Sequence, residues 1–256
     1  IEELTQFKKP IRYCQVNVGQ ANGTGELQGI ICGARNFRLN DYVVVALPGS
    51  ELPGGFKIAA RETYDHISNG MMCSGAELGL GAQANGIIVL GDEVADKVGE
   101  DARSIIGLHD TDFDVNITPD RGYALSARGL TREIASAFGL RFVDPAQDPA
   151  VGGVGRGRAS LSKKLIDVAV DPATKAKRFG LRKVEGIDPA ARTPFWMQRE
   201  LMLSGVRSVN AATDVTNYVM LLLGQPMHAF DADKISGDLR VHNAAGGEEF
   251  ETLDHA

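Results

Sequence analysis

The sequence contains few cysteines and no spacing typical of a structural metal site. Its three cysteines, Cys14, Cys32 and Cys73, are too few and too scattered for a disulfide framework. No CxxC or HxxxH pattern occurs, which argues against bound zinc. We therefore expect a reduced, cytoplasmic protein without a metal site or cofactor in this chain.

Long apolar runs and nucleotide-binding loops are also missing. No run approaches the roughly 20 apolar residues that a membrane-spanning helix needs. The first residues have neither the basic head nor the apolar core of a signal peptide. There is no GxxxxGK(S/T) loop, no GxGxxG after a strand and no GxSxG elbow. These absences argue against a membrane protein and against a self-contained nucleotide-using enzyme.

What is present is an ordinary globular composition with an uneven distribution of charge. Of 256 residues, 43% are hydrophobic and 23% charged, which argues against disorder of the whole chain. The net charge is −6, and it arises in the first part: residues 1–112 carry 9 basic and 15 acidic side chains. Residues 113–256 carry 18 of each sign. The two parts therefore differ in surface character.

The first part has the pattern of a small β-domain. Residues 13–18 alternate apolar and polar side chains, and residues 29–33, 42–47 and 86–90 are short runs rich in β-branched residues. Turn-forming Gly, Pro and Asn residues separate these runs. Several short strands at this spacing predict a small barrel.

One helix and a linker follow. Pro119 suits a first helical position, and apolar residues then recur every three or four positions up to Phe138, before Gly139. Residues 145–158 contain two prolines and four glycines, which is typical of a linker, although a surface loop within one domain has the same composition.

The last part mixes strands and helices. Residues 165–170, 180–185 and 239–243 are predicted strands. One predicted helix begins at Thr193-Pro194 and ends near Ser204, and a second begins with Asp214 as its cap and ends at Gly224. The fold class predicted is therefore α+β and multidomain: a β-barrel followed by a mixed α/β module.

His228 is the titratable group of greatest interest. It lies just past the end of the second predicted helix, in a loop where polar functional groups are often displayed. Asp231, three residues later, is placed to orient its imidazole. The alternative is a partly buried histidine that Asp231 or a carbonyl satisfies, and the pattern alone favours this alternative.

Thr216 and Asn217 form a second candidate site. In the first turn of a helix capped by Asp214, they would lie near unpaired backbone N–H groups, where a carbonyl or sugar hydroxyl can bind. Simple capping around Asp214 explains the same residues equally well. Arg207, in the turn between the two helices, is placed for a phosphate contact or is a solvated surface arginine.

Arg35 and Asn36 follow a predicted strand and are candidates for contact with nucleic acid at the rim of a barrel. Because this part is net acidic, any RNA contact needs a local basic patch. The alternative is scattered surface charge. The candidate members of the patch are Lys8, Lys9, Arg12, Arg35 and Arg38.

Five segments together resemble the β subunit of bacterial phenylalanyl-tRNA synthetases, almost from end to end. Residues 31–36 (ICGARN), 52–58 (LPGGFKI) and 70–79 (GMMCSGAELG) are similar to its tRNA-binding OB-fold module. Residues 117–121 (ITPDR) resemble the segment after that module. The most specific segment, residues 214–231, begins DVTNYVM, ends GQPMHAFD and is similar to the editing module.

The resemblance implies four parts: a tRNA-binding OB-fold domain over 1–112, a helical connection over 113–144, a linker over 145–159, and the first part of an editing domain over 160–256. It also implies an α₂β₂ class II ligase that charges tRNA(Phe) with phenylalanine, using ATP and Mg²⁺, with the synthetic site in the α subunit. The editing module hydrolyses tyrosine wrongly attached to that tRNA.

The resemblance gives each candidate residue a role. Thr216 and Asn217 hold the aminoacyl group or terminal ribose, His228 orients substrate or water, and Arg35 and Asn36 contact tRNA. Compared with the family, the chain begins inside the OB region and ends within the editing module. It is therefore expected to be a fragment that is inactive in charging by itself. The alternative functions are a non-enzymatic tRNA- or partner-binding OB-fold protein and a structural brace for the α subunit.

Overall fold

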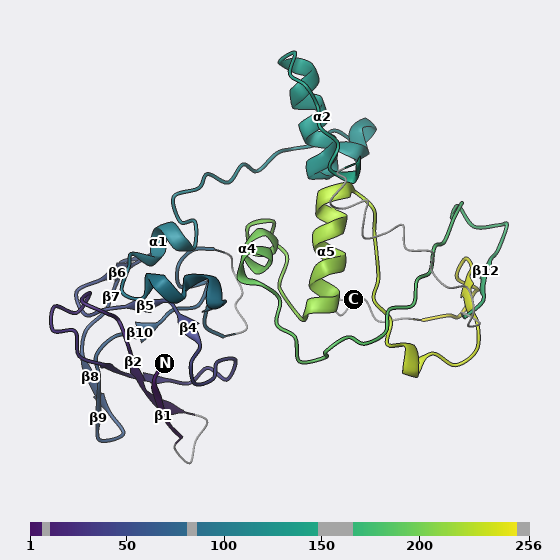
Figure 1. The fold of residues 1–256 in the computed structure, drawn as a ribbon. Helices are drawn as coiled ribbons and strands as arrows, with labels where there is room; N and C mark the ends of the chain where they lie inside the picture. Colours follow the sequence, from purple (N-terminus) through teal and green to yellow (C-terminus); the bar gives the residue numbers. More distant parts are fainter. Residues whose placement is uncertain (7–10, 81–85, 148–165, 250–256) are drawn as a thin grey trace. The chain divides into compact units, whose positions relative to one another are not determined.

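The structure is a computed structural model that describes residues 1–6, 11–80, 86–147 and 166–249 (Figure 1). The chain divides into two compact units. The first unit combines residues 1–140 with 191–227, and the second combines 141–190 with 228–256. The boundaries predicted at 112 and 160 stay predictions. Most of the predicted linker before residue 160 lies outside the described residues.

An antiparallel three-stranded sheet opens the first unit. Its strands are β1 (Glu3–Gln6), β2 (Arg12–Val16) and β3 (Gln28–Cys32), in the order β1-β2-β3. Cys14 lies opposite Ile30, and both side chains are buried. The alternation predicted from residue 13 onward is confirmed, since alternate side chains of a strand point to opposite faces.

The other strands of this unit are short and form antiparallel pairs. The pairs are β4 with β11, β5 with β10, β6 with β7, and β8 with β9. The barrel predicted for this part is therefore not seen: among the described residues the small sheets do not close, because strands of two or three residues each pair with one neighbour only. The bounds are β4 Tyr42–Val43, β5 Val45–Ala46, β6 Glu51–Leu52, β7 Phe56–Lys57, β8 Arg61–Thr63, β9 His66–Ser68, β10 Met71–Met72 and β11 Val89–Leu90.

Two clusters of buried apolar side chains stabilise the first unit. One cluster contains Cys14, Ile30 and Phe37, beneath the three-stranded sheet. The other contains Cys73, Ile106 and, from much later in the chain, Phe195. Burying such side chains contributes roughly 1.5–3 kcal/mol each, so Phe195 ties the helices after residue 191 to the β-rich part.

The helical segment after residue 118 is interrupted, in contrast to the single helix predicted. A 3₁₀-helix, η2 (Pro119–Leu125), has Pro119 at its start as predicted, and α2 (Ala127–Ala137) follows. Ser126 breaks the run because its hydroxyl accepts a hydrogen bond from the Gly129 amide and caps α2. The side chain of Phe138 on the predicted apolar face is 75% exposed.

Two longer helices complete the first unit: α4 (Phe195–Leu203) and α5 (Ala211–Leu223), which pack against each other. The end of α4 near Ser204 agrees with the sequence prediction. Gly224 ends α5 as predicted, with a φ of 81°, a left-handed conformation that glycine adopts without strain. The shorter helices of this unit are η1 (Asp92–Lys97) and α1 (Ala102–Ile105).

The second unit contains one pair of parallel strands among its described residues. β12 (Val168–Val170) pairs with β13 (Leu239–Val241), in agreement with two predicted strands. The predicted strand over 180–185 is wrong, since those residues have no regular structure. Two 3₁₀-helices, η3 (Pro145–Gln147) and η4 (Ala232–Lys234), also belong to this unit.

Candidate functional site

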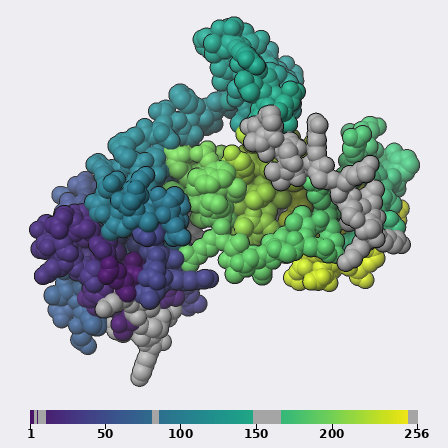
Figure 2. All heavy atoms as spheres, viewed as in Figure 1, coloured from purple at the N-terminus to yellow at the C-terminus, as the bar shows by residue number. Residues whose placement is uncertain are grey.

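The site begins with α4, which the β-rich part of the first unit holds firmly. The Arg199 guanidinium donates to the carbonyl oxygens of Ile106 and Gly107, both at 2.9 Å. It also pairs with Asp110 and Glu200. In Figure 2 the blue-green atoms of the α1 region accordingly lie against the light-green atoms of α4. Because α4 is anchored, the residues just before it have a defined position.

Asp214 lies completely buried near the start of α5, with no side-chain exposure. Its carboxylate accepts hydrogen bonds from the Thr193 hydroxyl at 2.5 Å, the Ser208 hydroxyl at 2.6 Å and the Val209 amide at 2.8 Å. A buried carboxylate is tolerated when donors surround it in this way. Asp214 therefore fixes both the residue before α4 and the turn between α4 and α5.

This network corrects the predicted start of α5. The helix begins at Ala211, and its cap is Asn210, whose side-chain oxygen accepts from the Thr213 amide at 3.0 Å. Thr216 and Asn217 are consequently in the second turn, away from the unpaired amides of the helix start. The Thr216 hydroxyl donates to the Thr213 carbonyl at 2.7 Å, and both predicted site residues are half-buried.

His228 lies in the second unit, in an exposed loop. Its ring meets that of Phe230 edge-on, with ring centres 4.5 Å apart. The Asp231 carboxylate has other partners, since it accepts from the Asp233 amide and pairs with Lys234 at 3.3 Å. The alternative of a partly buried histidine is wrong, because His228 is exposed. Within neither unit does the structure gather all three predicted editing residues.

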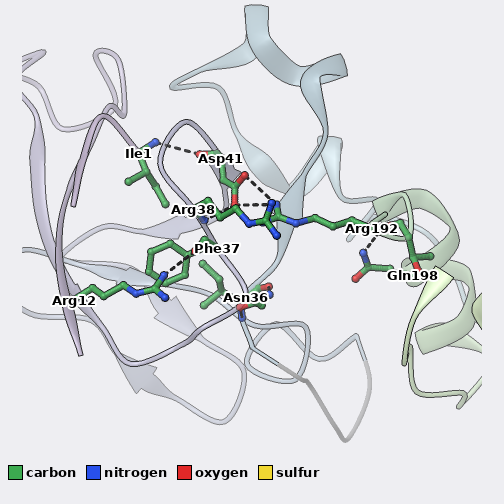
Figure 3. Close-up of polar contacts among 10 residues, drawn as sticks. Ile1, Arg12, Asn36, Phe37, Arg38, Asp41, Arg192 and Gln198 are labelled. Atoms are coloured by element: carbon green, nitrogen blue, oxygen red, sulfur yellow. Dashed lines mark hydrogen bonds and ion pairs between the residues drawn. The ribbon is translucent and has the colours of Figure 1, made fainter. Parts of the chain in front are cut away.

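A cleft of about 720 Å³ lies in the first unit, between the residues after β3 and those that flank α4. Arg35, Arg38, Arg192 and Arg207 contribute to its wall. Arg192 pairs with Asp41 at 2.9 Å, as Figure 3 shows, and so links the two sides. The acidic residues of the wall are Asp41, Asp92 and Glu93. Arg35 and Arg207 come from distant segments of the sequence and line one cleft.

Asn36 has a structural role in the same wall. Its side-chain amide donates to the Ile87 carbonyl at 2.7 Å, and its oxygen accepts from the Ile87 amide at 3.1 Å. The neighbouring Gly86 has a φ of 114°, and a Cβ there would collide with the Asn36 side chain. Contact of Asn36 with RNA stays a prediction, and its amide is already bonded to the chain.

The five-residue basic patch is only partly present in the described structure. The Arg12 guanidinium donates to the Phe37 carbonyl at 2.7 Å and lies 4.8 Å from the centre of the Phe37 ring (Figure 3). It therefore braces the core. Lys8 and Lys9 lie outside the described residues. Arg35 and Arg38 are exposed and belong to the cleft.

Asp214 as a network centre and Arg192 as a cleft residue were both missed from the sequence. Arg192 meets Asp41 across 151 positions, and no local pattern signals such a pair. Trp196 is 51% exposed and its ring meets that of Tyr218 edge-on. Its neighbours on α4, Met197 and Leu201, are buried.

The three cysteines are free thiols buried in the first unit. Burial raises the pKa of the Cys14 and Cys73 thiols to about 11 and also raises the pKa of Cys32. Such thiols are poor nucleophiles at neutral pH. Over the described ranges, no three His, Cys, Asp or Glu side chains converge as metal ligands. No helix in the described part is long and apolar enough to cross a membrane.

Comparison with known proteins supplies the context for these sites. The B3/4 domain family matches residues 175–256. The phenylalanine–tRNA ligase beta subunit of Corynebacterium glutamicum is 68% identical over 255 residues, which cover 100% of this chain and 30% of that protein. That of Corynebacterium diphtheriae is 69% identical, with 100% and 31% covered. That of Thermobifida fusca is 54% identical, with 100% and 30% covered. The chain thus spans under a third of the length of these relatives.

Proposed function

Because the chain belongs to the phenylalanine–tRNA ligase beta-subunit family, we propose that it forms part of an enzyme that charges tRNA(Phe) with phenylalanine in the cytoplasm. The observation that carries the proposal is identity of 68–69% along the whole chain to two such subunits. The enzyme is a class II α₂β₂ assembly in this proposal. ATP and Mg²⁺ act at a synthetic site in the α subunit, outside this chain.

We assign two contributions to the chain. Residues 1–112 form an OB-fold module that binds tRNA, and residues 160–256 form the first part of an editing module. The short antiparallel strands and the clustered core of the first unit are compatible with the former. The B3/4 match over 175–256 supports a second module after the linker. It favours the ligase over a free-standing OB-fold protein.

An editing site is needed because phenylalanine and tyrosine are hard to discriminate by binding alone. Phenylalanine and tyrosine differ by one hydroxyl. An apolar pocket that binds phenylalanine rejects the hydroxylated side chain by only about a hundredfold. A second, hydrolytic site that prefers the hydroxylated side chain supplies the rest. The ester is already activated, so a positioned water is a sufficient nucleophile.

Each proposed editing residue has a chemically suitable group. His228 is exposed, and its imidazole nitrogens can hydrogen-bond to substrate or water. Asn217 offers both a donor and an acceptor for the aminoacyl group or ribose. The Thr216 hydroxyl donates within the helix, and its lone pairs remain able to accept from a ligand.

The proposal is tested with a complete β subunit that contains this chain, co-purified with its α subunit. We expect ATP-dependent charging of tRNA(Phe) with phenylalanine, and hydrolysis of tyrosyl-tRNA(Phe) supplied as substrate. An assembly that charges but leaves tyrosyl-tRNA(Phe) intact would remove the editing assignment. An assembly that does not charge tRNA(Phe) would remove the ligase assignment.

A further inference from the structure

The cleft of the first unit has more arginines than acidic residues in its wall. We propose that it binds backbone phosphates of RNA through Arg35, Arg38 and Arg207. The inference rests on the proposed tRNA partner and goes beyond it, because it joins residues on the two sides of one cleft and assigns them a ligand group. Asn36 has a structural role in this site.

These three arginines are the available cations of the cleft. Within the described part of the chain, none of them has an ion-pair partner, and all three are exposed. Arg192, the fourth arginine of the wall, is paired with Asp41. A guanidinium offers five N–H donors in a fixed fork that suits phosphate oxygens. The three side chains can therefore bind an anion without first breaking an ion pair.

Charge distribution favours this cleft over the rest of the surface. The whole chain has 27 basic and 33 acidic side chains, so its general field repels RNA. The cleft reverses that balance, with four arginines against three acidic residues. Asp41 is already paired with Arg192, which leaves Asp92 and Glu93 as the opposing charges. We therefore expect weak binding that salt abolishes readily, because few phosphates are neutralised.

The arginine on the helical side is held in place by structure. Arg207 immediately precedes Ser208 and Val209, whose hydroxyl and amide donate to the buried Asp214. The opposite side is fixed by the two hydrogen bonds between Asn36 and Ile87, next to Arg35. The backbone on both sides is thus organised before a ligand arrives, which lowers the entropic cost of binding.

The test measures binding of a fluorescent tRNA(Phe) transcript to this chain by anisotropy, at several salt concentrations. Arg35→Ala and Arg207→Ala should each weaken binding by about three- to tenfold, and each should reduce the slope of log affinity against log salt by about one. Arg61→Ala is the matched control. Arg61 is an exposed arginine on β8, in the same unit but outside the cleft. Asp92→Asn should strengthen binding, because it removes an opposing charge.

Three results would overturn the inference. One is an equal effect of Arg61→Ala and Arg207→Ala, which would indicate a diffuse charge effect. The second is competition by ATP or pyrophosphate at micromolar concentration, which would make the cleft a site for small phosphates, as its volume also permits. The third is no tRNA binding by the unmodified chain. The charging assay of the assembled enzyme is independent of all three, so failure here leaves the ligase assignment standing.

Discussion

The two units of the chain differ sharply in how much they bury. Every described side chain that is buried belongs to the first unit, including both apolar clusters and the Asp214 network. The described part of the second unit is organised around the parallel pair of β12 and β13. Among the described residues, stability should therefore come mainly from the first unit, since burial of apolar surface is the main stabilising contribution.

The same division separates the proposed functional residues. Thr216, Asn217 and the arginines of the cleft are in the unit with a core, where neighbouring side chains fix their backbone. His228 is in the other unit and exposed. Substitution of the half-buried Thr216 or Asn217 should consequently affect stability and function together, whereas substitution of the exposed His228 should affect function alone.

The largest effect is expected from Asp214→Ala. The substitution removes the buried carboxylate that accepts hydrogen bonds from the Thr193 hydroxyl, the Ser208 hydroxyl and the Val209 amide. We expect the free energy of unfolding to fall by about 3 kcal/mol, measured by urea denaturation. Asp214→Asn keeps one acceptor oxygen and should cost less. A loss below about 0.5 kcal/mol for Asp214→Ala, the range of ordinary surface substitutions, would contradict the importance of the network.

The next effect concerns the buried thiols, all of which lie in the first unit. Burial raises the pKa of Cys14 and Cys73 to about 11, from the usual 9.0. The folded state thus resists thiol ionisation. Below pH 9 the thiols do not lower the free energy of unfolding, and it falls as the pH rises from 9 to 11. Each thiol should contribute up to about 2 kcal/mol of this loss. Denaturation at pH 8 and pH 10.5 measures it.

A matched variant separates this effect from the titration of lysine and tyrosine. Cys73→Ala creates a small cavity but removes one ionisable group, so its stability should vary less between pH 8 and pH 10.5 than that of the unmodified chain. Identical pH dependence in both proteins would show that thiol burial is not the cause.

The smallest effect on stability is expected from His228→Ala in this chain. Among the described residues, the His228 ring contacts the ring of Phe230, and the loop is exposed. The free energy of unfolding should change by less than about 0.5 kcal/mol, as for surface substitutions generally. A loss as large as that of Asp214→Ala would show that the second unit also has a stabilising core.

Local patterns predicted the longer helices and several of the strands, because these elements arise from the backbone and immediate neighbours. The alternation around Cys14 identified a strand, and Gly224 marked the end of a helix through its left-handed conformation. The failures have long-range causes. Asp214 and Asn210 are both good cap residues, and Thr193, 21 positions away, helps to hold Asp214 in a different role. The run over 180–185 has the composition of a strand but no partner strand in the described second unit.

The candidate sites were less predictable than the elements. Arg35 and Arg207 were identified separately as possible phosphate contacts, but only the folded chain places them in one cleft. Arg192 and Asp41 pair across 151 positions. Residue type and spacing therefore indicate what chemistry is available, whereas tertiary contacts decide which groups are free to perform it.

We expect the exposed His228 to serve editing and not stability. The most direct test is hydrolysis of tyrosyl-tRNA(Phe) by the assembled enzyme, with and without His228→Ala, alongside phenylalanine charging by the same preparation. We expect hydrolysis to fall about ten- to a thousandfold, since the residue positions and polarises without forming a covalent bond. Charging and melting temperature should be unchanged. Unchanged hydrolysis in a natively folded variant, or equal losses of hydrolysis and charging, would contradict the account.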